Sequence, residues 1–184
     1  MKFEPIDVTL KNGISVQIRE GNSNDAQELI EIMKETLRTT EYLLVDEEEF
    51  NMTLEQEIAW LNTFDSIATS LYLVATYDNK IVGNMGIVGN LIKKMKHTSS
   101  IGISLKEEWR NIGLGRIFME EGIKWAKEKT DIEILWLDVF SLNVTAVSLY
   151  EKLGFVEEGR QKNFCKLKGE RYCDKIIMSL PLNK

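Results

Sequence analysis

The fold is decided by the stretch Ser100-Ile-Gly-Ile-Ser-Leu-Lys-Glu-Glu-Trp-Arg-Asn-Ile-Gly-Leu-Gly-Arg-Ile-Phe-Met119. Within it, the spacing of the apolar residues changes from that of a strand to that of a helix. Its first six residues alternate apolar and small side chains, which predicts a half-buried strand. From Leu114 the apolar residues recur at helical spacing, which predicts a helix to about Lys129. The stretch therefore predicts a strand, a glycine-containing loop and a helix in direct succession.

The loop of this stretch has the composition of an anion site. Two glycines where a helix begins let the backbone approach a ligand closely. The unpaired N–H groups and the positive end of the helix dipole favour an anion there, most often phosphate. Arg110 and Arg116 add forked donors suited to phosphate oxygens. The loop predicts a pyrophosphate cradle, and the alternative is an ordinary turn, because it matches neither a Walker A loop nor a GxGxxG fingerprint.

The composition of the whole chain is that of one soluble globular domain spanning residues 1–184, with a core over about residues 14–180. Its 184 residues are 43% hydrophobic and 28% charged, enough for a substantial core. The net charge of −6 argues against the basic face of a nucleic-acid binder. No apolar run reaches the ~18 residues that span a bilayer. Cys165 and Cys173 have neither metal-ligand spacing nor a disulfide framework, so we expect a reducing cytoplasm and no metal.

Turn and cap signals predict the other elements. Asn12-Gly13 predicts a type I′ hairpin between residues 6–10 and 14–18. Asn24 is expected to cap a first helix. Thr53 and Gln56 are expected to form a capping box at the start of a second helix, which runs to about Phe64. The remaining predicted elements are strands at residues 70–76, 81–88, 132–139, 159–167 and 172–180, and a short helix after Asn143. This order predicts an α/β fold with a mixed central sheet flanked by helices.

A second motif follows the predicted strand 132–139. Asn143 is a good helix N-cap, and apolar residues from Ala146 to Leu153 stand at helical spacing. Gly154 lies where a glycine ends a helix, with Phe155 placed for the accompanying hydrophobic contact. A short capped helix accounts for all of these residues.

Taken together, Arg110-x-x-Gly113-x-Gly115 and Leu137-Asp-Val139-x-x-x-Asn143, continued by Leu149-Tyr-Glu-Lys-Leu-Gly-Phe155, resemble the acetyl-CoA site of the GNAT N-acetyltransferases. The resemblance implies the GNAT fold, in which two central strands splay apart and hold the cofactor. It also implies direct acetyl transfer from acetyl-CoA to a primary amine, either a small molecule or a protein N-terminus. The closing stretch, residues 168–178, looks like the branch with ribosomal-protein and small-amine acetyltransferases.

The resemblance also implies the roles of individual residues. Gly102 would let the pantetheine arm approach the strand, and the Tyr150 hydroxyl would face the thioester sulfur as general acid. A tyrosine with a reference pKa of about 10 keeps its proton until the thiolate leaves. The implied cofactor-binding residues are Ile103, Ser104, Leu105, Arg110, Asn111, Ile112, Gly113, Leu114, Gly115, Arg116, Asn143 and Tyr150.

The general base and the acceptor are left open. Many relatives carry a glutamate near the start of the central strand, where this chain has Ser99 and Ser100. His97, the only histidine, is the candidate base, and its alternative is a solvated residue in a basic turn. The acidic run Asp46–Glu49 could attract a cationic amine or could simply be a solvated loop.

Two other functions compete with the enzyme. A non-catalytic acyl-CoA-binding sensor is favoured by the missing strand carboxylate, whereas the retained Tyr150 favours catalysis. A cysteine hydrolase would need a Cys–His pairing that the sequence gives no reason to expect.

The resemblance also bears on oligomeric state: many relatives form homodimers through their last strands, and a homodimer is one expectation for this chain.

Overall fold

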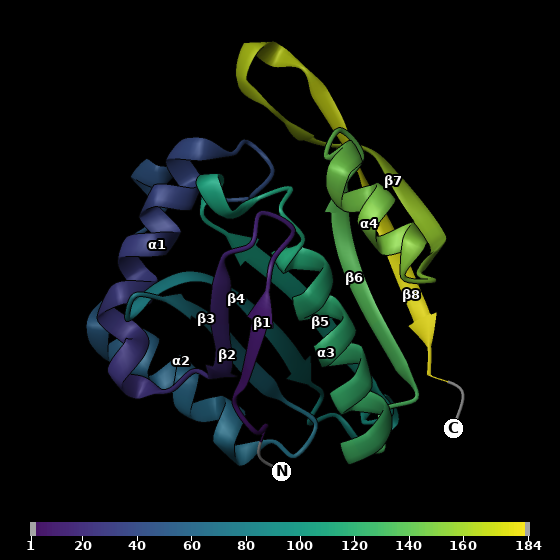
Figure 1. Ribbon diagram of the computed structural model, residues 1–184. Helices are drawn as coiled ribbons and strands as arrows, with labels where there is room; N and C mark the ends of the chain where they lie inside the picture. The colour runs from purple at the N-terminus through teal and green to yellow at the C-terminus, as the bar shows by residue number, and fades with distance from the viewer. Residues whose placement is uncertain (1–2, 183–184) are drawn as a thin grey trace.

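An eight-stranded sheet with helices on both faces makes up residues 3–182, the part of the chain that the computed structural model describes (Figure 1). The strands are β1 Ile6–Thr9, β2 Ser15–Glu20, β3 Leu71–Tyr77, β4 Lys80–Gly89, β5 Thr98–Leu105, β6 Ile134–Phe140, β7 Val156–Lys166 and β8 Tyr172–Pro181. The helices are α1 Ala26–Thr39, α2 Leu54–Ser66, α3 Leu114–Lys129 and α4 Val144–Lys152. The predicted order of elements is confirmed.

The strand order is β1-β2-β3-β4-β5-β6-β8-β7. Every neighbouring pair is antiparallel except β5 and β6, which are parallel. Parallel neighbours need a crossover connection, and α3 provides it. The mixed sheet and the α/β fold class predicted from the sequence are therefore confirmed.

The parallel pair is joined over only three residues of each strand. Thr98–Ser100 pair with Ile134–Trp136, and no pairing continues beyond them. On its other side, β5 pairs with β4 as far as Leu105. The two central strands thus separate after Ser100, which confirms the predicted splay and opens a seam in the middle of the sheet.

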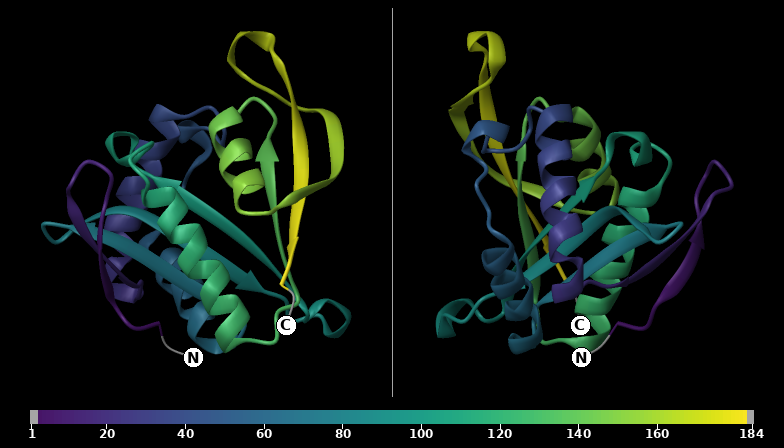
Figure 2. Two further views of the ribbon diagram at one scale, coloured as in Figure 1. Left: turned by 45° about the vertical axis from the view of Figure 1, so that its right-hand side comes forward. Right: turned by 90° about the vertical axis from the view of Figure 1, so that its left-hand side faces the viewer.

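α1 and α2 lie on one face of the sheet, and α3 and α4 lie on the other (Figure 2). α1 and α2 pack on one face, against Tyr72 and Val74. α3 packs on the opposite face, where a Cβ at Gly122 would come within 2.7 Å of the Met85 methyl group, so helix and sheet are in close contact there. No helix within residues 3–182 combines the length and the apolar character needed to cross a membrane.

Most local predictions hold, and the clearest differences are at the start of α1 and at the start of β7. The Thr53–Gln56 capping box is present, with both bonds formed. The expected Asn24 cap is wrong: the side chain of Asn22 accepts from Asn24 N at 2.9 Å and caps a 3₁₀ turn that precedes α1. β7 begins at Val156 instead of residue 159, two residues after Gly154, the glycine that ends α4.

The β1–β2 hairpin is confirmed, but its turn type differs from the prediction. A type I′ turn needs positive φ at both central residues, and only Gly13 has it, at 83°. Leu10 N donates to Ile14 O at 2.8 Å, and Gly13 N donates to Leu10 O at 2.9 Å. These bonds enclose a three-residue loop, a common hairpin connection that needs a left-handed residue only at its last position.

Candidate active site

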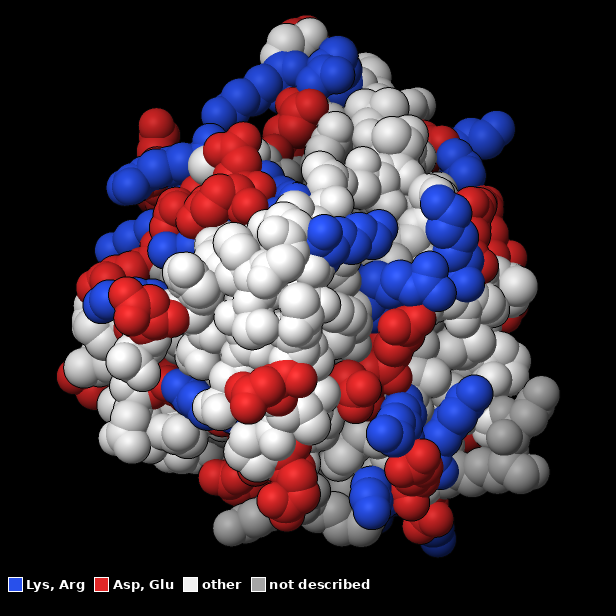
Figure 3. Space-filling view, viewed as in Figure 1, with Lys and Arg blue, Asp and Glu red and all other residues white. Residues whose placement is uncertain are grey.

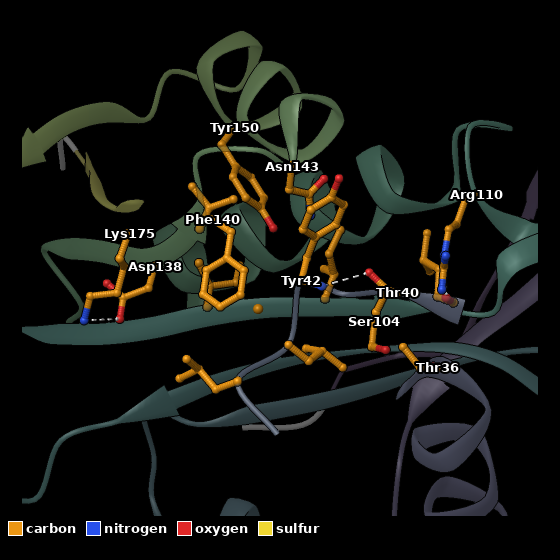
Figure 4. Close-up of a pocket in the computed structure, with 17 residues that line it drawn as sticks. Thr36, Thr40, Tyr42, Ser104, Arg110, Asp138, Phe140, Asn143, Tyr150 and Lys175 are labelled. Atoms are coloured by element: carbon orange, nitrogen blue, oxygen red, sulfur yellow. Dashed lines mark hydrogen bonds and ion pairs between the residues drawn. The ribbon is translucent and has the colours of Figure 1, made fainter. Parts of the chain in front are cut away.

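A cavity of about 470 Å³ lies in the seam between β5 and β6 (Figure 4). It is bounded by the end of α1 and the loop after it, by both central strands, by α4 and by β8. Its lining residues are Thr36, Thr40, Tyr42, Leu43, Leu44, Ile101, Gly102, Ile103, Ser104, Leu105, Arg110, Asp138, Val139, Phe140, Asn143, Tyr150 and Lys175.

The edge of β5 that faces the seam has no partner strand beyond Ser100. Ile103, Ser104 and Leu105, all predicted cofactor-binding residues, line the cavity along this edge. Strand edges present N–H and C=O groups that an extended ligand can pair with. The geometry therefore suits an extended chain that carries amide groups.

The loop before α3 has the backbone of an anion cradle. Asn111 and Gly113 both have positive φ, 62° and 100°. The first backbone bond of α3 runs from Ile117 N to Gly113 O at 3.1 Å. The N–H groups of Leu114, Gly115 and Arg116 therefore have no acceptor inside the helix and point out of its positive end.

Three residues of this region also have packing roles, which the sequence indicated for Leu114 alone. A Cβ at Gly115 would lie 3.1 Å from Ile103 Cδ1, so this glycine brings α3 close to β5. Leu114 is fully buried in the core, and the partly buried Ile112 packs against it. Ile112, Leu114 and Gly115 can therefore contact a ligand only through their main-chain groups.

Arg110 is placed differently from the expectation that its side chain surrounds a pyrophosphate. Its Nε donates to Leu105 O at 3.1 Å, and its Nη2 donates to Thr39 Oγ1 at 3.0 Å. The guanidinium thus ties the end of α1 to the end of β5. Arg116 Nε donates to Glu120 at 2.8 Å on the helix surface.

Asn143 and Tyr150 reach the cavity from α4 (Figure 4). Asn143 Oδ1 accepts from Ala146 N at 3.3 Å, which is the predicted N-cap. Tyr150 is 7% exposed, and its ring lies 6.0 Å from that of Phe155. Burial raises the pKa of Tyr150 to about 12, so the hydroxyl is protonated at neutral pH.

His97 does not join these residues. It is exposed in the turn before β5, and its carbonyl accepts from Glu133 N at 2.8 Å. It is absent from the cavity lining and lies at the opposite end of β5 from Leu105, roughly 25 Å away along the strand.

Sequence reasoning missed an acidic residue in the cavity. Asp138 is the only carboxylate among the described residues that line it, and Lys175 Nζ lies 3.5 Å from its Oδ2. The signal was present in the alternation of β6: Leu137 and Val139 are buried, so Asp138 between them faces the other side of the sheet. That Lys175, on β8, meets it there could not be read from the sequence.

The acidic run after α1 lies beside the main cavity. Glu47 accepts from Arg38 Nε at 2.7 Å, a hydrogen bond that lowers the pKa of Glu47. Asp46 lines a smaller neighbouring cavity of about 80 Å³ with Glu41. The run does not line the main cavity itself.

Comparison with known proteins gives consistent matches. The model of the acetyltransferase (GNAT) family matches residues 27–155. An L-amino acid N-acetyltransferase of Escherichia coli (strain K12) is 31% identical over 107 residues, covering 58% of this chain and 65% of that protein. The ribosomal protein bS18-alanine N-acetyltransferase of the same strain is 37% identical over 81 residues, covering 44% and 53%. The chain thus spans less than two thirds of either relative. A solved GNAT-family acetyltransferase from Streptococcus pneumoniae has a TM-score of 0.85 and 30% identity, covering 90% of this chain and 99% of that one.

Proposed function

The chain belongs to the GNAT acetyltransferase family, and from that premise we propose that it transfers the acetyl group of acetyl-CoA directly to a primary amine. The observation that carries the proposal is the open seam. β5 and β6 part after Ser100, and the cavity between them is lined by a free strand edge, Asn143 and Tyr150. Acetyl-CoA is the co-substrate of the family.

The residues of the seam fit this cofactor. The main chain of Ile103 and Leu105 offers hydrogen-bonding groups to the two amides of the pantetheine arm, as a neighbouring strand would. The exposed N–H groups at the start of α3, with the left-handed Gly113 before them, suit the pyrophosphate. Asn143 lies beside the same cavity and can contact the arm.

Tyr150 is the proposed general acid. When bound, acetyl-CoA supplies an acyl group on a sulfur that leaves as a thiolate. The Tyr150 hydroxyl still carries its proton at neutral pH, because burial raises the pKa of Tyr150 to about 12. A protonated phenol at this position can donate to the departing sulfur.

Asp138 is the proposed general base, in place of His97. An ammonium acceptor must lose a proton before it can attack, and a carboxylate in the cavity can take that proton directly or through one water. Asp138 lines the cavity, whereas His97 is exposed outside it. Lys175, 3.5 Å away, can fix the orientation of the Asp138 carboxylate.

The acceptor is proposed to be a primary amine next to a carbonyl group. By their names, the two curated relatives act on L-amino acids and on the alanine of a ribosomal protein, and both acceptors have this arrangement. A free amino acid and a protein N-terminus are both within the proposal.

The test is an acceptor screen that measures release of the CoA thiol over amino acids, peptides with different first residues, and polyamines. Protein-dependent thiol release with an amino acid or peptide would support the proposal. If acetyl-CoA binds tightly and no amine reacts, the protein is a sensor and the proposal is wrong.

With an acceptor in hand, Asp138→Asn tests the base. We expect kcat to fall by about 10²–10⁴-fold, the usual contribution of a general base. Asp131→Asn is the matched control, because Asp131 is exposed just before β6 and outside the cavity. Equal loss in both variants, or no loss in Asp138→Asn, would remove Asp138 from this role.

A further inference from the structure

We propose that Lys11, in the turn between β1 and β2, is a cofactor-binding residue whose ammonium group neutralises the pyrophosphate of acetyl-CoA. The inference rests on the proposed function. It deepens that function by assigning the cradle's charge to a residue outside both cofactor motifs and outside residues 27–155, which match the family model.

The β1–β2 turn is docked against the loop before α3. Lys11 N donates to Ile112 O at 3.1 Å, which joins the two backbones directly. Leu10, in the same turn, is 4% exposed and belongs to the core. Figure 1 shows the tip of this hairpin beside the N-terminal end of α3. The position of the Lys11 main chain relative to the cradle is therefore fixed.

The side chain of Lys11 runs along the cradle. From the position of a Cβ at Gly113, the distances to Lys11 Cγ and Cε are 3.5 and 3.6 Å. The ammonium nitrogen is one bond beyond Cε, and Lys11 is exposed. The charge of Lys11 is therefore close to Gly113, the residue directly before α3.

The other cations of the loop are already engaged. Arg110 holds Thr39 and Leu105 through its guanidinium, and Arg116 donates to Glu120. Lys11 makes no ion pair with any residue in the described part of the chain. It is the cation of the cradle whose charge is not yet compensated.

This arrangement matches a pyrophosphate better than a neutral ligand. Outward-pointing N–H groups and the helix dipole favour an anion, and a flexible ammonium adds a point charge that can adjust to phosphate oxygens. The face that holds the cradle also shows cations gathered between α3 and α4, on a surface where charges of both signs are otherwise mixed (Figure 3).

The test compares Lys11→Met with the parent by calorimetric titration of acetyl-CoA. Methionine keeps most of the apolar stem and removes the charge. We expect the dissociation constant to rise about tenfold, the size of one charge-assisted hydrogen bond. Lys11→Arg, which keeps the charge, should stay within about threefold of the parent. Lys127→Met is the matched control, an exposed lysine at the other end of α3, and should bind as the parent does.

CoA carries a pyrophosphate and a 3′-phosphate on its ribose, and titration of 3′-dephospho-CoA shows which of the two Lys11 contacts. The same loss with CoA and with 3′-dephospho-CoA supports the pyrophosphate assignment. A loss with CoA alone would assign Lys11 to the ribose phosphate and overturn it. Equal affinity of Lys11→Met and the parent would also overturn the assignment. So would a loss of affinity that stays the same at high salt, because salt screens the interaction of an exposed charge. Failure of the parent to bind acetyl-CoA would instead refute the proposed function.

Discussion

The ring and the hydroxyl of Tyr150 do different things, and one substitution separates them. The ring packs beside Phe155, and the hydroxyl is placed at the cavity. Tyr150→Phe keeps the ring, so acetyl-CoA affinity should stay within about threefold of the parent. Loss of the proton donor should lower kcat by about 10²–10⁴-fold.

Steady-state kinetics with the acceptor, together with calorimetric titration, would check this prediction. Tyr172→Phe is a suitable control, because Tyr172 is 60% exposed and lies outside the cavity. A Tyr150→Phe variant that turns over at the parent rate would show that the ring is only a core anchor.

Single residues also show where sequence reasoning ends. His97 and Asp138 are both groups that can take a proton, and the sequence analysis offered only His97 as a candidate base, with a solvated residue in a basic turn as its alternative. The structure exposes His97 in a turn and places Asp138 in the cavity. Residue type can be read from a sequence, but the direction of a side chain depends on strand alternation and on what the opposite face packs against.

At the scale of elements, the junction between β2 and α1 depends on one ion pair. Arg19 donates to both carboxylate oxygens of Asp25, at 2.8 and 2.9 Å, and Asp25 also accepts from Asn22 N. Burial raises the pKa of Asp25, but the Arg19 and Asn22 hydrogen bonds outweigh it and hold the pKa below its usual value.

The pH dependence of this pair has a definite sign. The pKa of Asp25 is lower in the folded than in the unfolded state, so its stabilisation is present above the unfolded value of about 3.9 and is lost as pH falls through the folded value. Asp25→Asn should lower the free energy of unfolding by about 2 kcal/mol at pH 7. The gap to the parent should narrow below pH 4.

Urea unfolding at neutral and acidic pH would measure both values. Asp65→Asn serves as the control, since Asp65 is exposed near the end of α2. A gap that stays constant with pH would mean that the carboxylate charge is not what stabilises the junction.

Elements were predicted well where the signal is local. The Thr53 and Asn143 caps and the left-handed Gly154, at φ 92°, each depend on residues within one helical turn. The first helix start was wrong because a 3₁₀ turn capped by Asn22 precedes α1, and an asparagine two residues further on carries the same signal. The turn at Gly13 was wrong in type because an Asn-Gly pair fits more than one loop length.

At the scale of the molecule, the cavity joins residues that are far apart in the chain. Thr36 at the end of α1 and Lys175 on β8 line the same space as β5. No local pattern indicates such a meeting. The splay itself entered the sequence analysis only through the family resemblance, because no residue pattern in β5 marks Ser100 as the point where pairing with β6 ends.

Binding of acetyl-CoA in the open seam should raise the thermal stability of the whole molecule. A ligand that binds only the folded state, at 100 times its dissociation constant, adds about 2.7 kcal/mol. For a chain of this size, that corresponds to a rise of about 5–10 °C in the midpoint of thermal unfolding. We expect acetyl-CoA to produce this rise.

Hydrogen exchange would locate the effect. The seam edge of β5 at residues 101–105 and the loop at 111–116 should exchange more slowly with acetyl-CoA bound, because their free N–H groups gain acceptors. β3, which is paired on both sides by β2 and β4, should change much less and is the internal control. A thermal shift without slowing at residues 101–105 would place the cofactor outside the seam, because a ligand paired with that edge must protect it.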